Sequence, residues 1–198
     1  TAYFITEMMD NMLDRADYPD PRFREMSTRY RHIGIGMMGL SDAMYMLDIK
    51  YDSADGRKFA KDIMKTINDA SLLRSSELAR EKEPFFNYDE YKDDVIEIVR
   101  EWTDDERIIE SVEKNGLRNS GTTSIAPTGS IALSADCSYG MEPCFGLVFK
   151  KNLISGESEL VINRVFQERF KGEPWYSDAL IERIAENKGS LKGLHGIP

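Results

Sequence analysis

Apolar side chains recur every three or four positions through the first two thirds of the chain, which is the spacing of one helical face. This pattern predicts helices over residues 3–14, 37–49 and 89–102. The longest periodic stretch is capped by Ser53 and ends near Pro84. Methionines follow several of these faces, and we expect them to fill the core: Met8, Met9, Met12, Met37, Met38, Met44 and Met46.

Polar residues, proline and glycine divide these helices from one another. Residues 17–31 are rich in proline and charge and are predicted to be a connector. Residues 103–106 (Thr-Asp-Asp-Glu) form a capping-box pattern, with Thr103 as the cap of a helix that Gly116 ends. Ser177 is predicted to cap a last helix that reaches about Asn187, and the chain ends in a loop.

The pattern changes after residue 120. Residues 121–126 are small and prone to form a strand, residues 127–130 form a turn signal, and residues 131–135 can begin a helix. Residues 138–143 are predicted to be a loop, and residues 144–151 and 160–162 to be strands. Helices that alternate with short apolar strands favour an α/β architecture. The late strands are expected to need partners outside this chain.

Composition and charge narrow the class of protein. The chain has 198 residues and a mass of 22.7 kDa, so we expect one domain or part of a larger one. Its net charge is −9, and an acidic chain has no general attraction for phosphate backbones, so we expect no nucleic-acid partner. A local anion site stays open, because backbone N–H groups can build one without Lys or Arg.

The sequence predicts no membrane segment and no export signal. No run approaches 18 uncharged apolar residues, and the N-terminus lacks a basic region before an apolar run. The first residue is not Met, which fits a piece of a longer chain. Two cysteines are too few for a disulfide scaffold and indicate a reducing cytoplasm. With two histidines and no Cys-x-x-Cys pair, we expect no metal site.

Gly34-Ile-Gly-Met-Met-Gly39 matches the glycine pattern of dinucleotide-binding loops. That interpretation needs a buried strand directly before the glycines, whereas residues 27–33 contain two arginines and a histidine. The acidic residue expected about 20 positions later, Asp52 or Asp55, belongs to a helix start. We therefore expect the glycines to allow close packing, and a nicotinamide dehydrogenase is the weakest functional hypothesis.

Residues 124–133 carry a stronger chemical signal. A short apolar strand leads into Pro127-Thr-Gly-Ser130 and then into a predicted helix. This order brings backbone N–H groups, two hydroxyls and the positive end of a helix dipole to one place, which suits an anion. Gly129 allows a phosphate to approach the chain, and Thr128 and Ser130 can donate hydrogen bonds. The same residues also form an ordinary turn, so the pattern alone leaves both interpretations open.

The other candidate groups carry little chemistry by themselves. Cys137 and Cys144 have no neighbouring His or Lys to lower a thiol pKa, so buried inert cysteines are favoured over a redox pair. Glu142 is either a buried acid or a loop cap. His32 is more typical of a structural residue than of a catalytic one, and His195 lies in the predicted terminal loop.

Six stretches in series resemble the catalytic chain of ribonucleotide reductase, in that family's order and at about its spacing. The segment 125–131 followed by 140–143 is most similar to the adenosylcobalamin-dependent class, and the class I large chain is a close second. The stretches span nearly all of the chain: Arg31-His-Ile-Gly-Ile-Gly-Met-Met-Gly-Leu40, Tyr51-Asp-Ser53, Asn115-Gly-Leu-Arg-Asn-Ser120, Thr123-Ser-Ile-Ala-Pro-Thr-Gly-Ser-Ile131, Gly140-Met-Glu-Pro143 and Val148-Phe-Lys-Lys151.

The resemblance implies that residues 1–198 are one incomplete segment, the later part, of a ten-stranded α/β barrel with helices outside. By the same resemblance, the complete enzyme is expected to convert ribonucleotides to deoxyribonucleotides by thiyl-radical chemistry. The resemblance also carries expectations about cofactor and partners. It implies an adenosylcobalamin cofactor, a ribonucleotide substrate, the remaining parts of the reductase chain and a thioredoxin-type reductant, with a homodimer of the complete enzyme left open. The role of binding the substrate phosphates is carried onto Pro127, Thr128, Gly129, Ser130 and Ile131.

The chain departs from the family at the reactive sulfur. The family's radical cysteine lies in Asn-x-Cys-x-Glu, and neither Cys137 nor Cys144 fits that pattern. The reducing cysteine pair and the C-terminal shuttle cysteines have no counterpart either. We therefore assign no catalytic residue and expect the isolated chain not to turn over. A non-catalytic nucleotide-binding module and a segment of a class I large chain are the alternatives.

Overall fold

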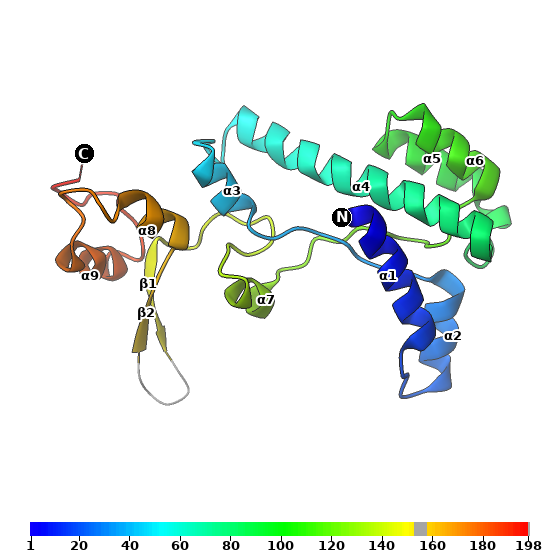
Figure 1. Ribbon diagram of the computed structural model, residues 1–198, viewed down its shortest axis with the longest axis horizontal. Helices are drawn as coiled ribbons and strands as arrows, with labels where there is room; N and C mark the ends of the chain where they lie inside the picture. Colours follow the sequence, from blue (N-terminus) through cyan, green and yellow to red (C-terminus); the bar gives the residue numbers. More distant parts are fainter. Residues whose placement is uncertain (153–157, 198) are drawn as a thin grey trace. The chain divides into compact units, whose positions relative to one another are not determined.

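The computed structural model describes residues 1–152 and 158–197, and the chain divides into two compact units. The first unit comprises Thr1–Met37 and Lys58–Ala126, and the second comprises Met38–Arg57 and Pro127–Pro198. Figure 1 shows the order of helices and strands along the chain. Within the described ranges, no helix is both long and apolar enough to cross a lipid bilayer.

The first unit is helical. In Figure 1, α5 and α6 lie side by side along the later part of the long helix α4. Their shared core consists of buried aliphatic side chains, among them Leu72 of α4, Val99 of α5 and Val112 of α6. The unit contains α1 (Ala2–Arg15), α2 (Pro21–Tyr30), most of α4 (Ala54–Lys82), the short 3-10 helix η1 (Tyr88–Glu90), α5 (Lys92–Trp102) and α6 (Glu106–Asn115).

Helix capping follows the sequence signals with one correction. Ser53 caps α4 as predicted, because its Oγ accepts a 3.0 Å hydrogen bond from the N–H of Gly56. The predicted cap of α6, Thr103, is wrong. Asp105 is the cap residue and accepts from the N–H of Arg107 at 3.0 Å, while Thr103 Oγ1 accepts from the N–H of Asp105. Gly116 ends α6 with φ +77°, a conformation that favours glycine.

The connector predicted over residues 17–31 is wrong, because most of it forms α2. Asp20 accepts a 2.8 Å hydrogen bond from the N–H of Arg22, and Pro21 occupies the first helical position. Proline suits that position because its missing N–H would have no partner there. None of the side chains of α2 is buried, and Phe23, Met26 and Tyr30, which recur at helical spacing, are exposed. The proline and the charges of this segment hid that spacing.

The expectation that methionines fill the core is wrong for several of them. Met44 is buried, but Met8 and Met12 are 53% and 58% exposed, and Met38 and Met46 are exposed as well. Helix α1 instead buries Thr6 and Asp10. Asp10 accepts a 2.7 Å hydrogen bond from Nε of the buried Arg31, so α1 packs through a polar face and leaves its methionine face outside.

Two extended segments of the first unit lie side by side. Ile35 and Thr123 form a parallel bridge, and the N–H of Ser124 donates to the carbonyl of Ile35 at 3.0 Å. Ile33 and Ile35 are buried, while His32 and Gly34, which alternate with them, are exposed. The strand predicted over residues 121–126 is thus realised only at Thr123 among the described bridges.

The second unit combines short helices with a hairpin. Strands β1 and β2 pair antiparallel, with Val148 opposite Ile162, so both late strands form, although the first begins at Val148 and not at residue 144. Val148 packs in one core with Phe166 and Ile184. Ser177 caps the last helix as predicted. The unit contains α3 (Leu40–Met46), α7 (Gly129–Ser134), β1 (Val148–Asn152), β2 (Ser158–Ile162), α8 (Arg164–Phe170) and α9 (Asp178–Glu186), of which α8 was not predicted.

Candidate functional site

The predicted anion loop lies at the N-terminal end of α7, on the surface of the second unit. Thr128 is the cap residue of α7 and has a left-handed backbone, φ +51°. The helix begins directly at Gly129, as the order of turn and helix predicted, two residues earlier than expected. Residues 129–131 are exposed, with 59% of the surface of Ile131 accessible. The loop is therefore open to a ligand.

Three backbone N–H groups of α7 are available as donors. The first hydrogen bond of the helix runs from the N–H of Ala132 to the carbonyl of Thr128, at 2.8 Å. The N–H groups of Gly129, Ser130 and Ile131 precede it, and within the described ranges no carbonyl or side chain accepts from them. Such unsatisfied N–H groups at a helix start are the groups that bind anions in many proteins.

The side chains of the loop have different roles. Thr128 Oγ1 accepts a 2.7 Å hydrogen bond from the N–H of Gly140, so this hydroxyl is built into the fold but still has a proton to donate. Ser130 is exposed, and its carbonyl accepts from the hydroxyl of Ser134. Pro127 is exposed and carries no N–H. Added to Gly129, a Cβ would meet nothing within 4 Å, so the space above this residue is open.

Neutral donors dominate the surroundings of the loop. Residues 124–143 contain no Lys or Arg and two acidic residues, Asp136 and Glu142. Both are exposed, so Glu142 is not the buried acid that one interpretation allowed. Asp136 lies 3.7 Å from Arg164, which balances its charge. An anion held here would depend on amides and hydroxyls.

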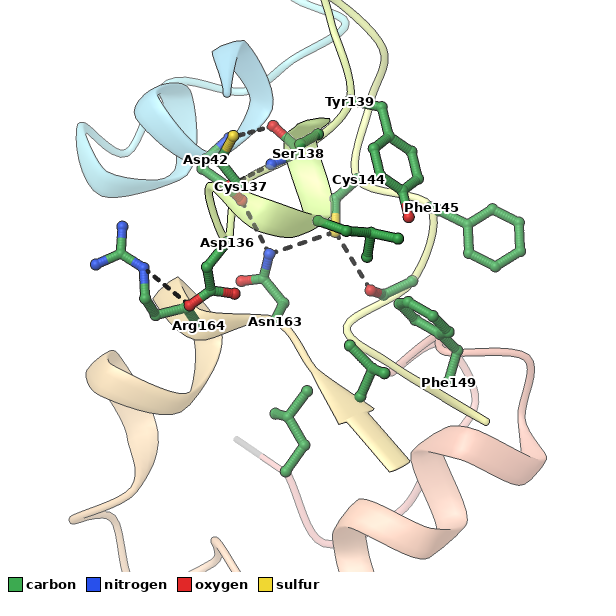
Figure 2. Close-up of a pocket in the computed structure, with 15 residues that line it drawn as sticks. Asp42, Asp136, Cys137, Ser138, Tyr139, Cys144, Phe145, Phe149, Asn163 and Arg164 are labelled. Atoms are coloured by element: carbon green, nitrogen blue, oxygen red, sulfur yellow. Dashed lines mark hydrogen bonds and ion pairs between the residues drawn. The ribbon is translucent and has the colours of Figure 1, made fainter. Parts of the chain in front are cut away.

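A cavity of about 80 Å³ lies behind α7 and is drawn in Figure 2. Ala132 and Leu133 of α7 line it together with Phe149 of β1. None of the five predicted phosphate-binding residues lines this cavity. The cavity and the loop are thus two different features of the second unit.

Cys137 and Cys144 line the same cavity as free thiols. Both are half-buried, and burial raises the pKa of each thiol. The Cys144 Sγ also donates to the carbonyl of Gly146 at 3.3 Å. A raised pKa keeps a thiol protonated and unreactive, which favours the inert interpretation over a redox pair.

The glycines of the 34–39 pattern serve packing. A Cβ added to Gly34 would lie 2.7 Å from Cβ of Ser124, and one added to Gly36 would lie 2.2 Å from the carbonyl oxygen of Ser124. Only glycine permits this approach of the two extended segments. Gly39, with φ +81°, is the cap residue before α3. The steric evidence supports the packing interpretation over the dinucleotide one.

The sequence missed a polar junction in the second unit that Asp42 and Asn163 form. Asp42 Oδ1 accepts a 2.9 Å hydrogen bond from Nδ2 of Asn163, and Asn163 Oδ1 caps α8 by accepting from the N–H of Phe166. Recognition of α8 would have identified Asn163 as a cap. Asp42 gives no signal, since it resembles a solvent-facing residue of a short helix.

Neither histidine forms part of a site: His32 is exposed beside Ser120, and His195 is exposed near the end of the chain. In the part of the chain that the structure describes, no three His, Cys, Asp or Glu side chains gather in a way that could hold a metal ion.

Comparison with known proteins identifies the family. Residues 1–198 match the family described as ribonucleotide reductase, barrel domain. The chain belongs to the ribonucleotide reductase barrel-domain family. The family fold is an α/β barrel, of which the described residues form a helix-rich part with few strands.

Several reductases align with almost the whole chain. The vitamin B12-dependent ribonucleoside-diphosphate reductase of Thermoplasma acidophilum is 32% identical over 196 residues, which cover 98% of this chain and 23% of that protein. The protein of the same name from Mycobacterium tuberculosis (strain CDC 1551 / Oshkosh) is 31% identical over 197 residues, covering 100% of this chain and 26% of that protein. The ribonucleoside-diphosphate reductase large subunit of Caenorhabditis elegans is 27% identical over 202 residues, which cover 98% of this chain and 26% of that protein. The chain therefore spans about a quarter of the length of these reductases.

The cavity behind α7 does not fit a cobalamin. Ligand pockets for molecules of drug size usually measure about 300 Å³ or more, and the cavity behind α7 measures about 80 Å³.

Proposed function

We propose that this chain is a segment of a ribonucleotide reductase and that residues 127–131 bind the phosphates of the substrate. The observation that carries the proposal is the open start of α7, where the N–H groups of Gly129, Ser130 and Ile131 have no acceptor within the described ranges. The same five residues lie in the stretch whose sequence resembles the reductase phosphate loop.

The physical argument rests on donors without charge. Three N–H groups and the hydroxyls of Thr128 and Ser130 surround one exposed bend, and the helix dipole adds a partial positive charge of roughly half a unit at most. Because residues 124–143 contain no Lys or Arg, neither term is reinforced by a cation from this stretch. We therefore expect the isolated loop to bind phosphates weakly and to act by orienting them.

The rest of the reductase chemistry is proposed for a larger assembly. Reduction at C2′ through a thiyl radical needs an activated sulfur, and the two thiols here have raised pKa values and lie outside the family's radical motif. We propose that the radical cysteine and the reducing thiols are supplied outside residues 1–198. Nucleotide reduction by the isolated chain would contradict this part of the proposal.

The cofactor and partners follow the same reasoning. Two of the similar reductases are named vitamin B12-dependent, so we propose adenosylcobalamin as the radical source of the complete enzyme. The ribonucleotide substrate and the remaining parts of the reductase are proposed from the family. The thioredoxin-type reductant, the homodimer and the cytoplasmic location stay predictions.

Calorimetric titration of the chain with cytidine diphosphate tests the phosphate role. Gly129→Asp places a carboxylate in open space, and repulsion between unit charges near a surface weakens binding by about tenfold or more. Gly129→Ala is the matched control, because its methyl group also meets nothing. An acidic residue in the first helical turn does not oppose α7, so lost binding would not reflect unfolding. Equal affinity of the Asp and Ala variants would overturn the proposal.

A further inference from the structure

The carboxylate of Asp42 is buried against the chain that follows α7. Its Oδ2 accepts a 2.6 Å hydrogen bond from the N–H of Ser138, and its own N–H donates to Ser138 Oγ at 3.3 Å. The carbonyl of Ser138 in turn accepts from the N–H of Gly39, just before α3, at 2.8 Å. Figure 2 shows Asp42 and Ser138 facing each other at the edge of the cavity. Three hydrogen bonds thus join α3 and its cap residue to Ser138, four positions after the end of α7.

The second carboxylate oxygen is also occupied. Asp42 Oδ1 accepts a 2.9 Å hydrogen bond from Nδ2 of Asn163, whose Oδ1 accepts from the N–H of Phe166 at 2.9 Å. Asp42 is 7% exposed, so little water can replace these partners. Each oxygen of the carboxylate therefore accepts from one donor. Loss of either oxygen would leave a donor without an acceptor at a site that water hardly reaches.

Both ends of the α7 segment are held by hydrogen bonds within the second unit. At its start, Thr128 Oγ1 accepts from the N–H of Gly140, and at its end Ser138 is held by Asp42. The N–H of Cys137 donates to the carbonyl of Ala132, which closes the last turn. The N–H groups of residues 129–131 project from a segment whose orientation these contacts fix.

We propose that Asp42 is a positioning residue: through Ser138 and Asn163 it fixes the direction in which the N–H groups of residues 129–131 point. The inference rests on the proposed phosphate role of those residues. Asp42 carries a negative charge on the same unit as the anion loop, so its electrostatic effect alone would oppose phosphate binding. Its contribution is therefore geometric. A substitution that removes its charge should strengthen phosphate binding if only electrostatics matter, and weaken it if Asp42 positions the loop.

The test compares Asp42→Asn with Asp136→Asn by titration with cytidine diphosphate and, separately, with pyrophosphate. Both substitutions remove one negative charge near α7. Asp136 is exposed, makes no bond to Ser138 or Asn163, and has a left-handed backbone that asparagine tolerates. We expect D42N to weaken binding by about tenfold, because a ligand must then order N–H groups that the parent chain holds in place. We expect D136N to leave affinity unchanged or to raise it.

A double exchange supplies the rescue. In D42N/N163D the new amide at position 42 can accept from Ser138 and donate to the new carboxylate at position 163. That carboxylate can still accept from the N–H of Phe166, and aspartate is as good a helix cap as asparagine. All three hydrogen bonds are then restored with the roles of the two side chains exchanged. We expect the affinity for both probes to return close to that of the parent chain.

Amide chemical shifts of Gly129, Ser130 and Ile131 without ligand separate this inference from the phosphate role. We expect D42N to change these chemical shifts and D136N to leave them unchanged. The double exchange should return them to the values of the parent chain. If the parent binds neither probe, the phosphate role fails, and these shifts alone decide the role of Asp42. The inference is wrong if folded D42N has the same affinity and the same amide shifts as the parent. It is also wrong if the double exchange restores neither the affinity nor the shifts. Should D42N not fold by circular dichroism, Asn163→Ala replaces it in the same comparisons.

Discussion

The hydroxyl oxygen of Thr128 accepts a 2.7 Å hydrogen bond from the buried N–H of Gly140, twelve residues further along the chain. Thr128 has φ +51°, a conformation that a β-branched residue rarely adopts and that costs on the order of 1–3 kcal/mol. The bond to Gly140 offsets part of that cost and keeps the bend before α7 in place. The side chain of Thr128 thus shapes the loop from inside it.

Replacement of Thr128 by Val tests this relationship. The variant keeps the shape of the side chain but leaves the N–H of Gly140 without an acceptor. We therefore expect the free energy of unfolding to fall by about 1–3 kcal/mol. Thr128→Ser is the control, since it keeps the oxygen and should be close to the parent. Urea unfolding at neutral pH measures both, and equal stability of the Val and Ser variants would show that the hydrogen bond does not hold the bend.

Gly36→Ala tests the packing role of the glycine pattern. Its methyl group would lie 2.2 Å from a backbone oxygen of Ser124, which no side-chain rotation can relieve. We expect a loss of about 1–3 kcal/mol in unfolding free energy, as for other overpacked sites. Gly129→Ala, whose methyl group meets nothing, should be neutral or slightly stabilising. A dinucleotide loop would behave differently: the parent would bind NADH, and Gly36→Asp would abolish that binding.

Asp105, the cap of α6, gives stability a defined dependence on acid. A hydrogen bond from the side chain of Arg107 lowers the pKa of Asp105 from 3.8 to about 2. Because the folded pKa is the lower one, this contribution is present above the unfolded pKa and is lost as the pH falls through the folded pKa. Asp105→Asn keeps a capping side chain but removes the titration.

Thermal unfolding of the parent chain and of Asp105→Asn, followed from about pH 5 down to pH 2, checks that dependence. We expect the parent to lose more stability than the variant over the lower part of this range, and the two chains to keep a constant difference above it. Parallel curves throughout would show that the Arg107 contact does not persist in solution.

Local sequence signals predicted the elements that depend on local physics. The apolar spacing of α4 and its Ser53 cap act within a few residues, and so does the turn that precedes α7. Helix α2 was missed because its segment is rich in proline and charge, although Asp20 and Pro21 form a recognisable start and Phe23, Met26 and Tyr30 follow helical spacing. The methionines of α1 misled for a related reason: periodicity locates an apolar face, but not whether that face or the opposite one meets the core.

The phosphate loop itself was predictable, whereas its support was not. Pro127, Thr128, Gly129 and Ser130 are contiguous, so their common chemistry is visible in the sequence. The contact between Asp42 and Ser138 joins residues 96 positions apart, and neither residue stands out from its neighbours. Contacts of that kind depend on how α3 packs within the second unit, which no local pattern encodes.

The central claim concerns the three N–H groups at the start of α7, and NMR observes them directly. A series of amide spectra of the nitrogen-15-labelled chain with increasing cytidine diphosphate is the most direct test. We predict that the largest shift changes fall on Gly129, Ser130 and Ile131, that pyrophosphate reproduces them, and that cytidine without phosphates does not. Shift changes that leave these three amides unmoved while others respond would contradict the account.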